Sequence, residues 1–474
     1  MKRRKILFAV PDGIGIRNYL YSDIISYLHG AGFEICLMHS LDPELIQLVN
    51  SRLEVPVQQL EFKTFPESKV QTFFREATTF ARLKSSVARK CNPTLLNNWS
   101  RRKSSWSKRV FYFFTELFGN RLKTYESIRF FESEIERHWT GNPAIAHYRK
   151  VLREVNPDLI FITHQRVPTL IPFCLAASLE KIKTISAIFS WDNIPKARLP
   201  IRTDFYAVWS DYMKAEVLDY YPEISPERIF VTGTPQFDFY SKEDLIIPRE
   251  SFARKYGLDT DKKWVLFSGD DVMTSPHDPE YLRDVAEALT SKPEIQILFR
   301  QVPVTSAERY QNVLDEYPNV IHVPPLWKKG AFWTSFFPLF EDVQLLMNLC
   351  HHCETVLNIG STMALDFAFF DKPGIFLKYD TVPDPNWSTS VVYQFQHFRS
   401  MEQLDAVLSV GSKEEILDKV SLAIMSPGLV AVDRSKWKDR IVKTDQPAAI
   451  ELLNLIQRLF PASVHPDALE KKSL

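Results

Sequence analysis

Short apolar runs alternate along the chain with longer amphipathic segments. A continuous apolar run of this length is typical of a buried strand, whereas apolar residues spaced by three and four predict a helix. Residues 5–10 (KILFAV) form the first run, and a helical pattern follows over residues 16–32. Further strands are predicted at residues 33–40, 156–164, 182–190, 204–210 and 228–233. Buried strands separated by helices indicate a parallel sheet covered on both faces.

The pattern starts again in the second half of the chain. Residues 241–262 are charged and lack a strand pattern, which indicates a linker. Apolar runs then predict strands at residues 263–270, 294–300, 319–324, 354–360 and 373–379. We therefore predict an α/β fold with two doubly wound domains. The predicted parts are an N-terminal domain over 1–240, a C-terminal domain over 263–430 and a helical tail over 431–474.

One region, residues 65–150, carries helical spacing but little strand signal, and it is predicted to be a helical insertion in the first domain. Within residues 75–109 the only acidic residue is Glu76, while basic residues are frequent and aromatic residues are interleaved. Three interpretations remain open: a track for single-stranded nucleic acid, a solvated helical excursion with an aromatic core, and a membrane-surface patch. We favour the patch, with Arg101, Arg102, Lys103 and Trp106 at the membrane, and expect no nucleic-acid partner.

Composition narrows the class of protein. The 474 residues contain 58 basic and 58 acidic residues, so any binding to an anionic partner must come from local charge. No apolar run is long enough to span a bilayer, and the short run at the start is interpreted as a strand and not a signal peptide. The five cysteines are an odd number in apolar surroundings, which suits reduced thiols. We expect a cytoplasmic protein that is peripheral at the inner face of the membrane.

A candidate phosphate site follows the predicted strand that ends at Gly360. Gly360 permits close backbone approach, and Ser361 and Thr362 can cap the next helix while donating hydroxyls to phosphate oxygens. Asp366 lies about one turn further on, where a carboxylate can accept hydrogen bonds from a ribose. An ordinary helix cap followed by a solvated aspartate explains the same residues.

Three segments resemble those of a known superfamily. Residues 360–376 (GSTMALDFAFFDKPGIF) resemble the donor-site segment of GT-B glycosyltransferases, a layout shared with UDP-N-acetylglucosamine 2-epimerases and CDP-glycerol glycerophosphotransferases. Residues 231–238 (VTGTPQFD) look like the turn that closes the first domain in those families. Residues 190–200 (SWDNIPKARLP) are similar to a segment of bacterial surface-carbohydrate transferases. The resemblance implies a GT-B fold, in which two Rossmann-like domains face a central cleft, with the nucleotide on the second and the acceptor on the first.

Carried onto this chain, the resemblance implies that Ser361 and Thr362 hold the diphosphate. Asp366 takes the place of the usual glutamate that binds ribose, and Asn358 stands where many retaining members have a further glutamate, which favours inversion weakly. Three more donor-site residues are expected. Arg300 ends a strand at the rim where a diphosphate would lie, while His322 and Val323 occupy the loop that commonly reads the base.

The acceptor side is expected in the first domain. Gly13 and Gly15 follow the first strand, but they form only a fragment of a dinucleotide fingerprint, so they suit a sugar and not NAD. Three residues are candidates for the base that takes a proton from the acceptor hydroxyl. Asp192 is preferred, with Asn193 to orient it, and the alternatives are Asp12 and His164.

Cys350-His351-His352-Cys353 invites a zinc interpretation, but it lacks a second pair of ligands and is not expected to bind metal. The interpretation that accounts for these features best is a metal-independent glycosyltransferase of surface-polysaccharide synthesis, without a cofactor. It would move a sugar from a nucleotide-sugar donor to a glycan or lipid-linked acceptor. The alternatives are a CDP-glycerol-type glycerophosphotransferase, a UDP-sugar 2-epimerase and a non-catalytic nucleotide-sugar-binding protein.

Overall fold

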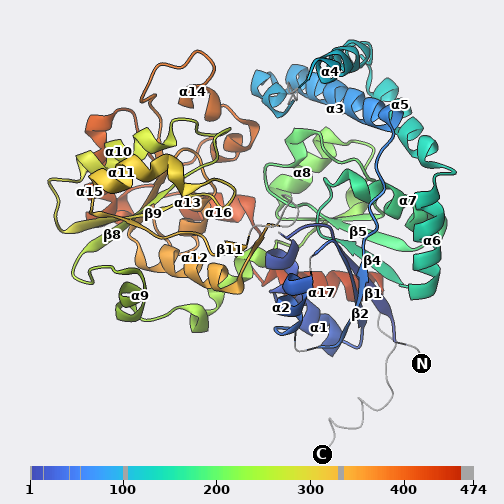
Figure 1. Ribbon diagram of the computed structural model, residues 1–474, viewed down its shortest axis with the longest axis horizontal. Helices are drawn as coiled ribbons and strands as arrows, with labels where there is room; N and C mark the ends of the chain where they lie inside the picture. The colour runs from blue at the N-terminus through green and yellow to red at the C-terminus, as the bar shows by residue number, and fades with distance from the viewer. Residues whose placement is uncertain are drawn as a thin grey trace, which may run out of the picture. The chain divides into compact units, whose positions relative to one another are not determined.

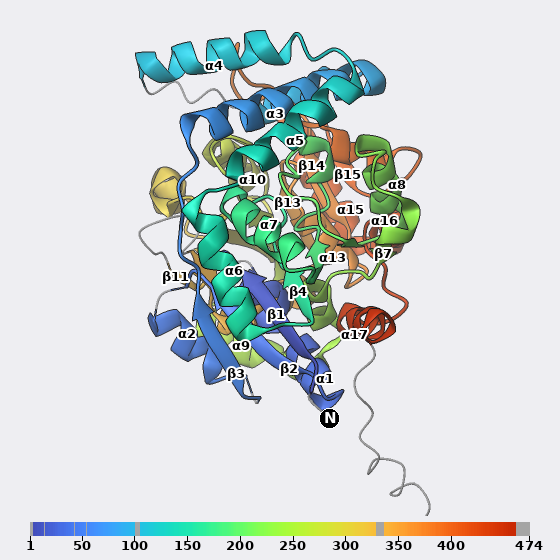
Figure 2. The same cartoon turned by 90° about the vertical axis from the view of Figure 1, so that its right-hand side faces the viewer.

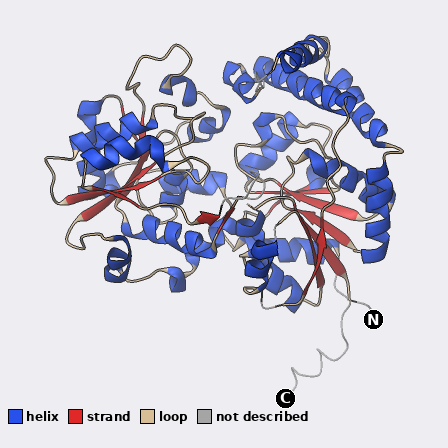
Figure 3. Ribbon diagram, viewed as in Figure 1, coloured by secondary structure: helices blue, strands red, loops and turns tan. Residues whose placement is uncertain are grey.

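The computed structural model describes residues 3–13, 15–41, 43–53, 55–99, 105–328 and 336–460. The chain divides into two compact units. The first runs to Gln236 and includes the chain again from Lys443 onward, and the second is built from described residues between Phe237 and Val442. Each unit has its own parallel sheet with helices on both faces, as the colouring in Figure 3 shows.

The first unit contains a seven-stranded sheet in the order β3-β2-β1-β4-β5-β6-β7, in which every neighbouring pair is parallel. The order reverses between β1 and β4, and ligands of such sheets bind beyond the carboxyl ends of the strands at that point. The strands are β1 (Lys5–Val10), β2 (Glu34–His39), β3 (Val57–Glu61), β4 (Leu159–Ile162), β5 (Lys183–Ala187), β6 (Phe205–Val208) and β7 (Ile229–Val231).

Helices cover both faces of this sheet (Figure 1). One face packs Leu7, Ala9 and Ile160 against the buried side chains of α6 and α7. On the other face, α17 from the end of the chain packs beside α1. These helices are α1 (Ile24–Gly30), α2 (Pro43–Asn50), α6 (Pro143–Val155), α7 (Ile171–Leu179), α8 (Asp211–Tyr220) and α17 (Ala448–Leu459).

The insertion forms a helical layer of the first unit. Its helices are α3 (Lys69–Lys90), α4 (Trp106–Gly119) and α5 (Tyr125–Trp139). Ser68 begins α3 with a capping box, and both α4 and α5 pack against α3. Figure 2 shows α3 and α5 between α4 and the sheet, so α4 is the outermost helix.

The second unit contains a six-stranded parallel sheet in the order β10-β9-β8-β13-β14-β15. Here the order reverses between β8 and β13. The strands are β8 (Lys263–Ser268), β9 (Ile295–Arg300), β10 (Val320–His322), β13 (Thr355–Asn358), β14 (Gly374–Leu377) and β15 (Leu408–Val410), and a separate pair is formed by β11 (Trp327–Lys328) and β12 (Phe337–Pro338).

The helices of the second unit enclose its sheet. Phe252 and Ala253 of α9 belong to the same buried cluster as Trp264 and Leu266 of β8, so the segment before β8 is packed onto the core. The helices are α9 (Arg249–Tyr256), α10 (Asp278–Ala288), α11 (Gln311–Glu316), α12 (Phe340–His352), α13 (Met363–Ala368), α14 (Thr389–Val392), α15 (Ile416–Met425) and α16 (Arg434–Ile441). Within the described residues, none of the helices has both the length and the apolar character needed to cross a bilayer.

Candidate functional site

The first unit brings two sequence-predicted residues together where its strand order reverses. Asp12 follows β1, His164 follows β4, and Oδ2 of Asp12 contacts Nδ1 of His164. Both side chains are buried. Because a carboxylate only accepts hydrogen bonds, this contact places the ring hydrogen on Nδ1 and leaves a lone pair on Nε2.

The other ring nitrogen of His164 is unusual for a buried polar atom. Nε2 is covered from solvent and has no hydrogen-bond partner among the described residues. Phe189 stacks on the imidazole ring, with 4.1 Å between ring centroids and an angle of 20° between planes. The ring is thus held in one orientation, and a carboxylate-oriented imidazole with one unused nitrogen is the arrangement that general bases use.

Gly15 allows the loops after β1 and β4 to approach each other. A Cβ atom at Gly15 would lie 2.7 Å from Oγ1 of Thr163, so the loop or the Thr163 side chain would have to shift. The backbone N–H of Gly15 also donates to Oδ1 of Asp12 at 3.3 Å. Gly15 and Gly13 therefore belong to the loop that carries Asp12 to His164, and Gly13 accepts a hydrogen bond from the N–H of Ile16.

Asp192 and Asn193 lie in a separate network after β5. The Asp192 carboxylate pairs with Lys196 and accepts a hydrogen bond from Nδ2 of Asn193 at 2.8 Å. Asn193 is buried and its Oδ1 accepts from Nε2 of Gln165 at 3.3 Å. Asn193 thus fixes the position of the Asp192 carboxylate, and the ammonium group of Lys196 balances its charge.

In the second unit, the turn after β13 is built around Gly360. Gly360 has a φ of +71°, and a Cβ there would lie 2.6 Å from Cζ of Phe398. Oδ1 of Asn358 accepts from the N–H of Ser361 at 2.9 Å and closes the turn, while Thr362 is exposed at the start of α13. Asp366 is buried, and its Oδ1 accepts from the hydroxyl of Tyr240 at 2.7 Å.

Arg300, which was expected at the rim where a diphosphate would lie, is paired with an acidic residue of the second unit. Its Nη2 donates to both oxygens of Asp342, at 2.8 and 3.0 Å, and both side chains are buried. The same carboxylate accepts from Nε1 of Trp327 at 2.7 Å. Nη1 of Arg300 is buried without a hydrogen-bond partner among the described residues. Arg300 therefore offers one nitrogen and has most of its charge balanced internally.

His322 and Val323 are held by the edge of the second sheet. The Val323 N–H donates to the carbonyl of Phe299 at 2.8 Å, and its side chain is fully buried, so that N–H is already committed to the sheet and is not available to a base. Nε2 of His322 contacts Oε1 of Gln301 at 2.8 Å, and burial lowers the pKa of the imidazole.

Two acidic residues after β8, Asp270 and Asp278, were not identified as candidates from the sequence. Burial first, and then the charges of Asp278 and Asp271, raise the pKa of Asp270 well above its usual value. Burial also raises the pKa of Asp278 to about 6, against the hydrogen bond from Tyr310, whose hydroxyl donates at 2.6 Å. Asp270 follows β8, at the point where the strand order of the second unit's sheet reverses. In the sequence, the only indication of this residue was the run Gly269-Asp270-Asp271 at the end of a predicted strand. A protonated carboxyl there can donate a hydrogen bond to an anionic ligand.

The Cys350–Cys353 segment packs as part of the core. Both cysteines are buried, and Nε2 of His352 contacts the carbonyl of Ile247 at 2.9 Å. Burial lowers the pKa of His352 to about 4. Across the described ranges, no group of three or more His, Cys, Asp or Glu side chains is arranged to hold a metal ion.

The basic and aromatic block is divided between the interior and the surface. Arg75 and Arg82 are turned inward and paired with Glu67 and Glu132, acids that lie outside the block in sequence. Phe73 and Phe74 pack on Phe118 between α3 and α4. Trp106, by contrast, is 78% exposed at the start of α4. Arg101, Arg102 and Lys103 lie outside the described residues.

Comparisons with known proteins identify the fold. No protein-family model and no curated protein matches the sequence. Among solved structures, UDP-GlcNAc 2-epimerase from Neisseria meningitidis bound to UDP-GlcNAc matches over 96% of this chain and 100% of its own, with 12% identity and a TM-score of 0.51.

Two further solved structures match over similar lengths. A putative UDP-N-acetylglucosamine 2-epimerase from Listeria monocytogenes matches over 97% of both chains, with 10% identity and a TM-score of 0.56. A glycosyltransferase from Rickettsia africae matches over 98% of this chain and 100% of its own, with 11% identity and a TM-score of 0.53. At such low identity these likenesses show the fold alone. They confirm the predicted α/β class and the GT-B-type fold.

Proposed function

We propose that the protein is a glycosyltransferase that transfers a sugar from a nucleotide-sugar donor to a glycan or lipid-linked acceptor. The observation that carries the proposal is the Asp12–His164 pair where the order of the first sheet reverses. A transferase needs a base there to take the proton of the attacking hydroxyl, and a buried, oriented imidazole with an unused nitrogen supplies one. Solved structures that share the fold bind UDP-GlcNAc or UDP according to their descriptions, which supports a nucleotide-sugar donor.

In the proposed reaction, Nε2 of His164 takes the proton as the acceptor oxygen attacks the anomeric carbon. The bond between that carbon and the phosphate oxygen breaks, and the nucleoside diphosphate leaves with the bonding electrons. Asp12 holds the ring and stabilises the imidazolium that forms. Since Nε2 is covered from solvent, the acceptor must displace the covering side chains before transfer. Asp192, paired with Lys196, then serves to position the acceptor and is not the base.

On the donor side, Ser361 and Thr362 would contact the diphosphate and Asp366 the ribose. The Gly360 turn supports this assignment because it places the hydroxyls of Ser361 and Thr362 just beyond the carboxyl end of β13. The carboxyl of Asp270, whose raised pKa favours its protonated form, and the remaining nitrogen of Arg300 are additional donors at the end of the same sheet.

The test is to incubate the purified chain with UDP-GlcNAc, UDP-glucose or CDP-glycerol and follow the products by NMR. Release of UDP with a new glycoside on an added oligosaccharide or polyprenyl-phosphate-sugar supports the proposal. Release of CMP from CDP-glycerol, with a phosphodiester formed, would instead assign glycerophosphate transfer. If every donor stays intact over this acceptor panel while the protein binds nucleotide tightly, the chain is a binding protein.

A second candidate function is 2-epimerisation of a UDP-sugar. It is favoured by the fold likeness to structures described as UDP-GlcNAc 2-epimerases. The same NMR experiment separates the two, because inversion at C2 breaks the C2–H bond and in D₂O replaces that hydrogen with deuterium. Such exchange without an acceptor would support the epimerase and contradict the transferase.

A finer part of the proposal is that α4 attaches the enzyme to the membrane surface, where lipid-linked acceptors lie. Trp106, Phe113 and Phe114 are exposed on this outermost helix, with Lys108 and Arg109 exposed between them. Aromatic side chains next to cations suit an interface with anionic lipid headgroups.

A further inference from the structure

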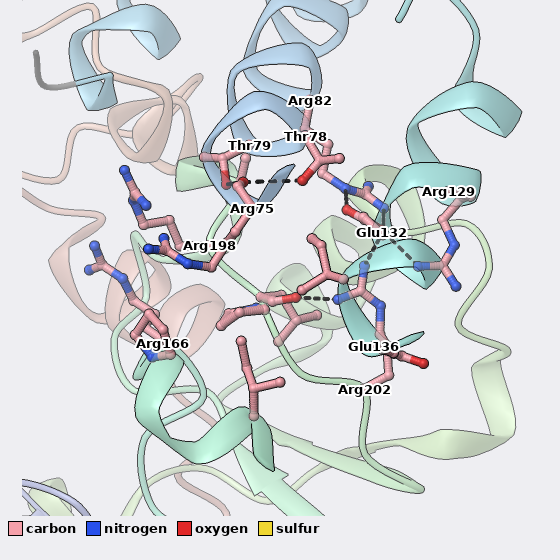
Figure 4. Close-up of a pocket in the computed structure, with 16 residues that line it drawn as sticks. Arg75, Thr78, Thr79, Arg82, Arg129, Glu132, Glu136, Arg166, Arg198 and Arg202 are labelled. Atoms are coloured by element: carbon pink, nitrogen blue, oxygen red, sulfur yellow. Dashed lines mark hydrogen bonds and ion pairs between the residues drawn. The ribbon is translucent and has the colours of Figure 1, made fainter. Parts of the chain in front are cut away.

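A pocket of about 590 Å³, measured to its open mouth, lies within the first unit between the helical layer and the loops after β4 and β5. Six arginines line it: Arg75, Arg82, Arg129, Arg166, Arg198 and Arg202. Figure 4 shows two groups, with Arg82, Arg129 and Arg202 gathered around Glu132, and Arg75, Arg166 and Arg198 on the opposite side. Such a concentration of guanidinium groups is not explained by the catalytic assignments above.

The group around Glu132 is balanced by its own carboxylates. Oε2 of Glu132 accepts from Arg82 at 2.8 Å, Arg129 at 2.6 Å and Arg202 at 3.1 Å. Glu223 adds a second carboxylate, 3.0 Å from Arg202 and 3.3 Å from Arg82. Glu136, which also lines the pocket, is the third, and the charges of Arg202 and Arg129 act on it, so three carboxylates face three guanidinium groups. Although burial alone would raise it, the charges of Arg202 and Arg82 lower the pKa of Glu132 to about 2. This side of the pocket is a structural ion-pair network that ties α3 and α5 to the loops before β6 and after α8.

The opposite side is not balanced. Arg75 pairs with Glu67 at 2.8 Å and with Glu76, and Arg198 reaches the same Glu76 at 3.4 Å. Arg166 makes no hydrogen bond or ion pair with the described residues, although its side chain is partly buried. Three guanidinium groups thus face two carboxylates, which leaves one uncompensated positive charge.

Burial of an uncompensated charge is costly, so the imbalance indicates that a ligand completes the site. Burial, followed by the like charge of Arg198, lowers the pKa of Arg166 despite the opposing charge of Asp192. A guanidinium prefers planar or tetrahedral oxyanions, to which it donates two parallel hydrogen bonds. The missing partner is therefore a carboxylate or a phosphate.

The position of Arg166 connects the pocket to the catalytic candidates. It follows His164 by two residues on the loop after β4, and the charge of Asp192 acts on it. We propose that Arg166, with Arg75 and Arg198 beside it, binds an oxyanion group of the acceptor, either a phosphate monoester or diester or the carboxylate of an acidic sugar. The identification of this ligand as the acceptor rests on the proposed transferase function, whereas the anion site itself does not.

The experiment is a calorimetric titration of the full chain at low ionic strength with glucose 6-phosphate, glucuronate and neutral glucose. Excess UDP is kept present so that it occupies the donor site and glucose 6-phosphate does not bind there. We expect one of the anions to bind at least about tenfold more tightly than glucose, and Arg166→Gln to abolish that preference. Preference for glucose 6-phosphate assigns a phosphate-bearing ligand, and preference for glucuronate assigns an acidic sugar.

Two further variants sharpen the result. Arg166→Lys should retain part of the preference, because lysine keeps the positive charge but cannot donate the two parallel hydrogen bonds of a guanidinium group. Arg153→Gln is the matched control: Arg153 is an exposed arginine of the first unit that pairs with Glu180 at 2.8 Å, and its loss should change nothing. Arg198→Gln should weaken the binding of the same anion. This variant provides a test that does not depend on how the Arg166 variants fold.

The inference is overturned if neither anion is preferred over glucose, or if Arg166→Gln and Arg198→Gln bind the anion as the wild type does. A separate titration with UDP, CDP and GDP distinguishes this failure from failure of the proposed function. If none of the three nucleotides binds but the anion preference follows Arg166, the anion site stands and the transferase proposal falls. If one nucleotide binds and the anion preference is absent, the proposed function stands and the anion site falls.

Discussion

The carboxylate of Asp12 contacts Nδ1 of His164, although the two residues are 152 positions apart in the sequence. The contact is possible because β1 and β4 are neighbours in the first sheet, which brings the loops after the two strands to the same edge. Nε2 on the far side of the ring has no partner among the described residues. This pair decides which residue is proposed as the base, because Asp192 is already paired with Lys196.

Replacement of His164 should separate catalysis from donor binding. We expect His164→Gln to reduce the transfer rate by about 10²–10⁴-fold, the usual contribution of a general base. Asp12→Asn should also reduce the rate, because it no longer fixes the ring hydrogen on Nδ1, and Asp192→Asn should have the smallest effect of the three. The measurement is the rate of UDP release in the presence of the acceptor. His138→Gln, at an exposed histidine of α5, is the control, and an equal loss in Asp192→Asn and His164→Gln would contradict the assignment.

The turn at Gly360 should not tolerate a side chain. Its φ of +71° is strained for any other residue, and the added Cβ would meet Phe398 at 2.6 Å. We expect Gly360→Ala to lower the free energy of unfolding by about 1–3 kcal/mol, measured by urea denaturation. Gly428→Ala is the matched control, because a Cβ there meets nothing within 4 Å. Equal stability of the two variants would show that the turn is not constrained as described.

Glu216 should make the stability of the first unit depend on pH. Burial first, and then the charges of Asp192 and Asp219, raise the pKa of this carboxyl to about 8, against the charge of Lys90. An unfolded glutamate titrates near 4.5, so the folded chain binds one more proton between these values and loses stability as the pH rises from 4.5 to about 8. At pH 7 the loss is about 3 kcal/mol.

The check is the melting temperature of the wild type and of Glu216→Gln between pH 5 and pH 8. We expect the wild type to lose more thermal stability over this interval than the variant, whose amide cannot ionise. The exposed Glu126 provides the control, since Glu126→Gln should keep the wild-type pH dependence. Parallel pH profiles for the wild type and Glu216→Gln would contradict the prediction.

Membrane attachment through α4 predicts binding to anionic vesicles in a flotation assay. We expect replacement of Trp106, Phe113 and Phe114 by serine to abolish flotation, and charge reversal at Arg101, Arg102 and Lys103 to weaken it, because both parts of the patch contribute. Serine replacement of Met425 and Leu429, which are 74% and 78% exposed in the second unit, should have no effect. Flotation that survives all of the α4 changes would refute attachment through this helix.

The positions of most buried strands along the chain could be predicted from the sequence because these strands are continuous apolar runs. β3 (Val57–Glu61) was missed, since its residues VQQLE lie at a half-exposed edge and carry no apolar run. The partners of the inward-facing arginines could not be predicted either, because Glu132 and Glu223 reach Arg82 from distant parts of the chain.

The candidate site was predictable in its residue types but not in its pairings. Asp12, His164 and Asp192 all follow predicted strands, yet the sequence alone does not say which of them meet. Arg300 illustrates the same limit, because its partner Asp342 lies on α12, 42 positions away. A side chain at the end of a strand can face a ligand or a neighbouring helix, and only the packing decides.

The proposed function requires that a nucleotide-sugar binds in the second unit around Gly360 and Asp366, separately from the base in the first unit. Its most direct test is calorimetric titration with UDP, CDP and GDP of the wild type, Asp366→Asn and His164→Gln. We predict saturable 1:1 binding of one nucleotide, about tenfold weaker in Asp366→Asn and unchanged in His164→Gln. Absence of binding by every nucleotide, or loss of binding in His164→Gln with full affinity in Asp366→Asn, would contradict the account.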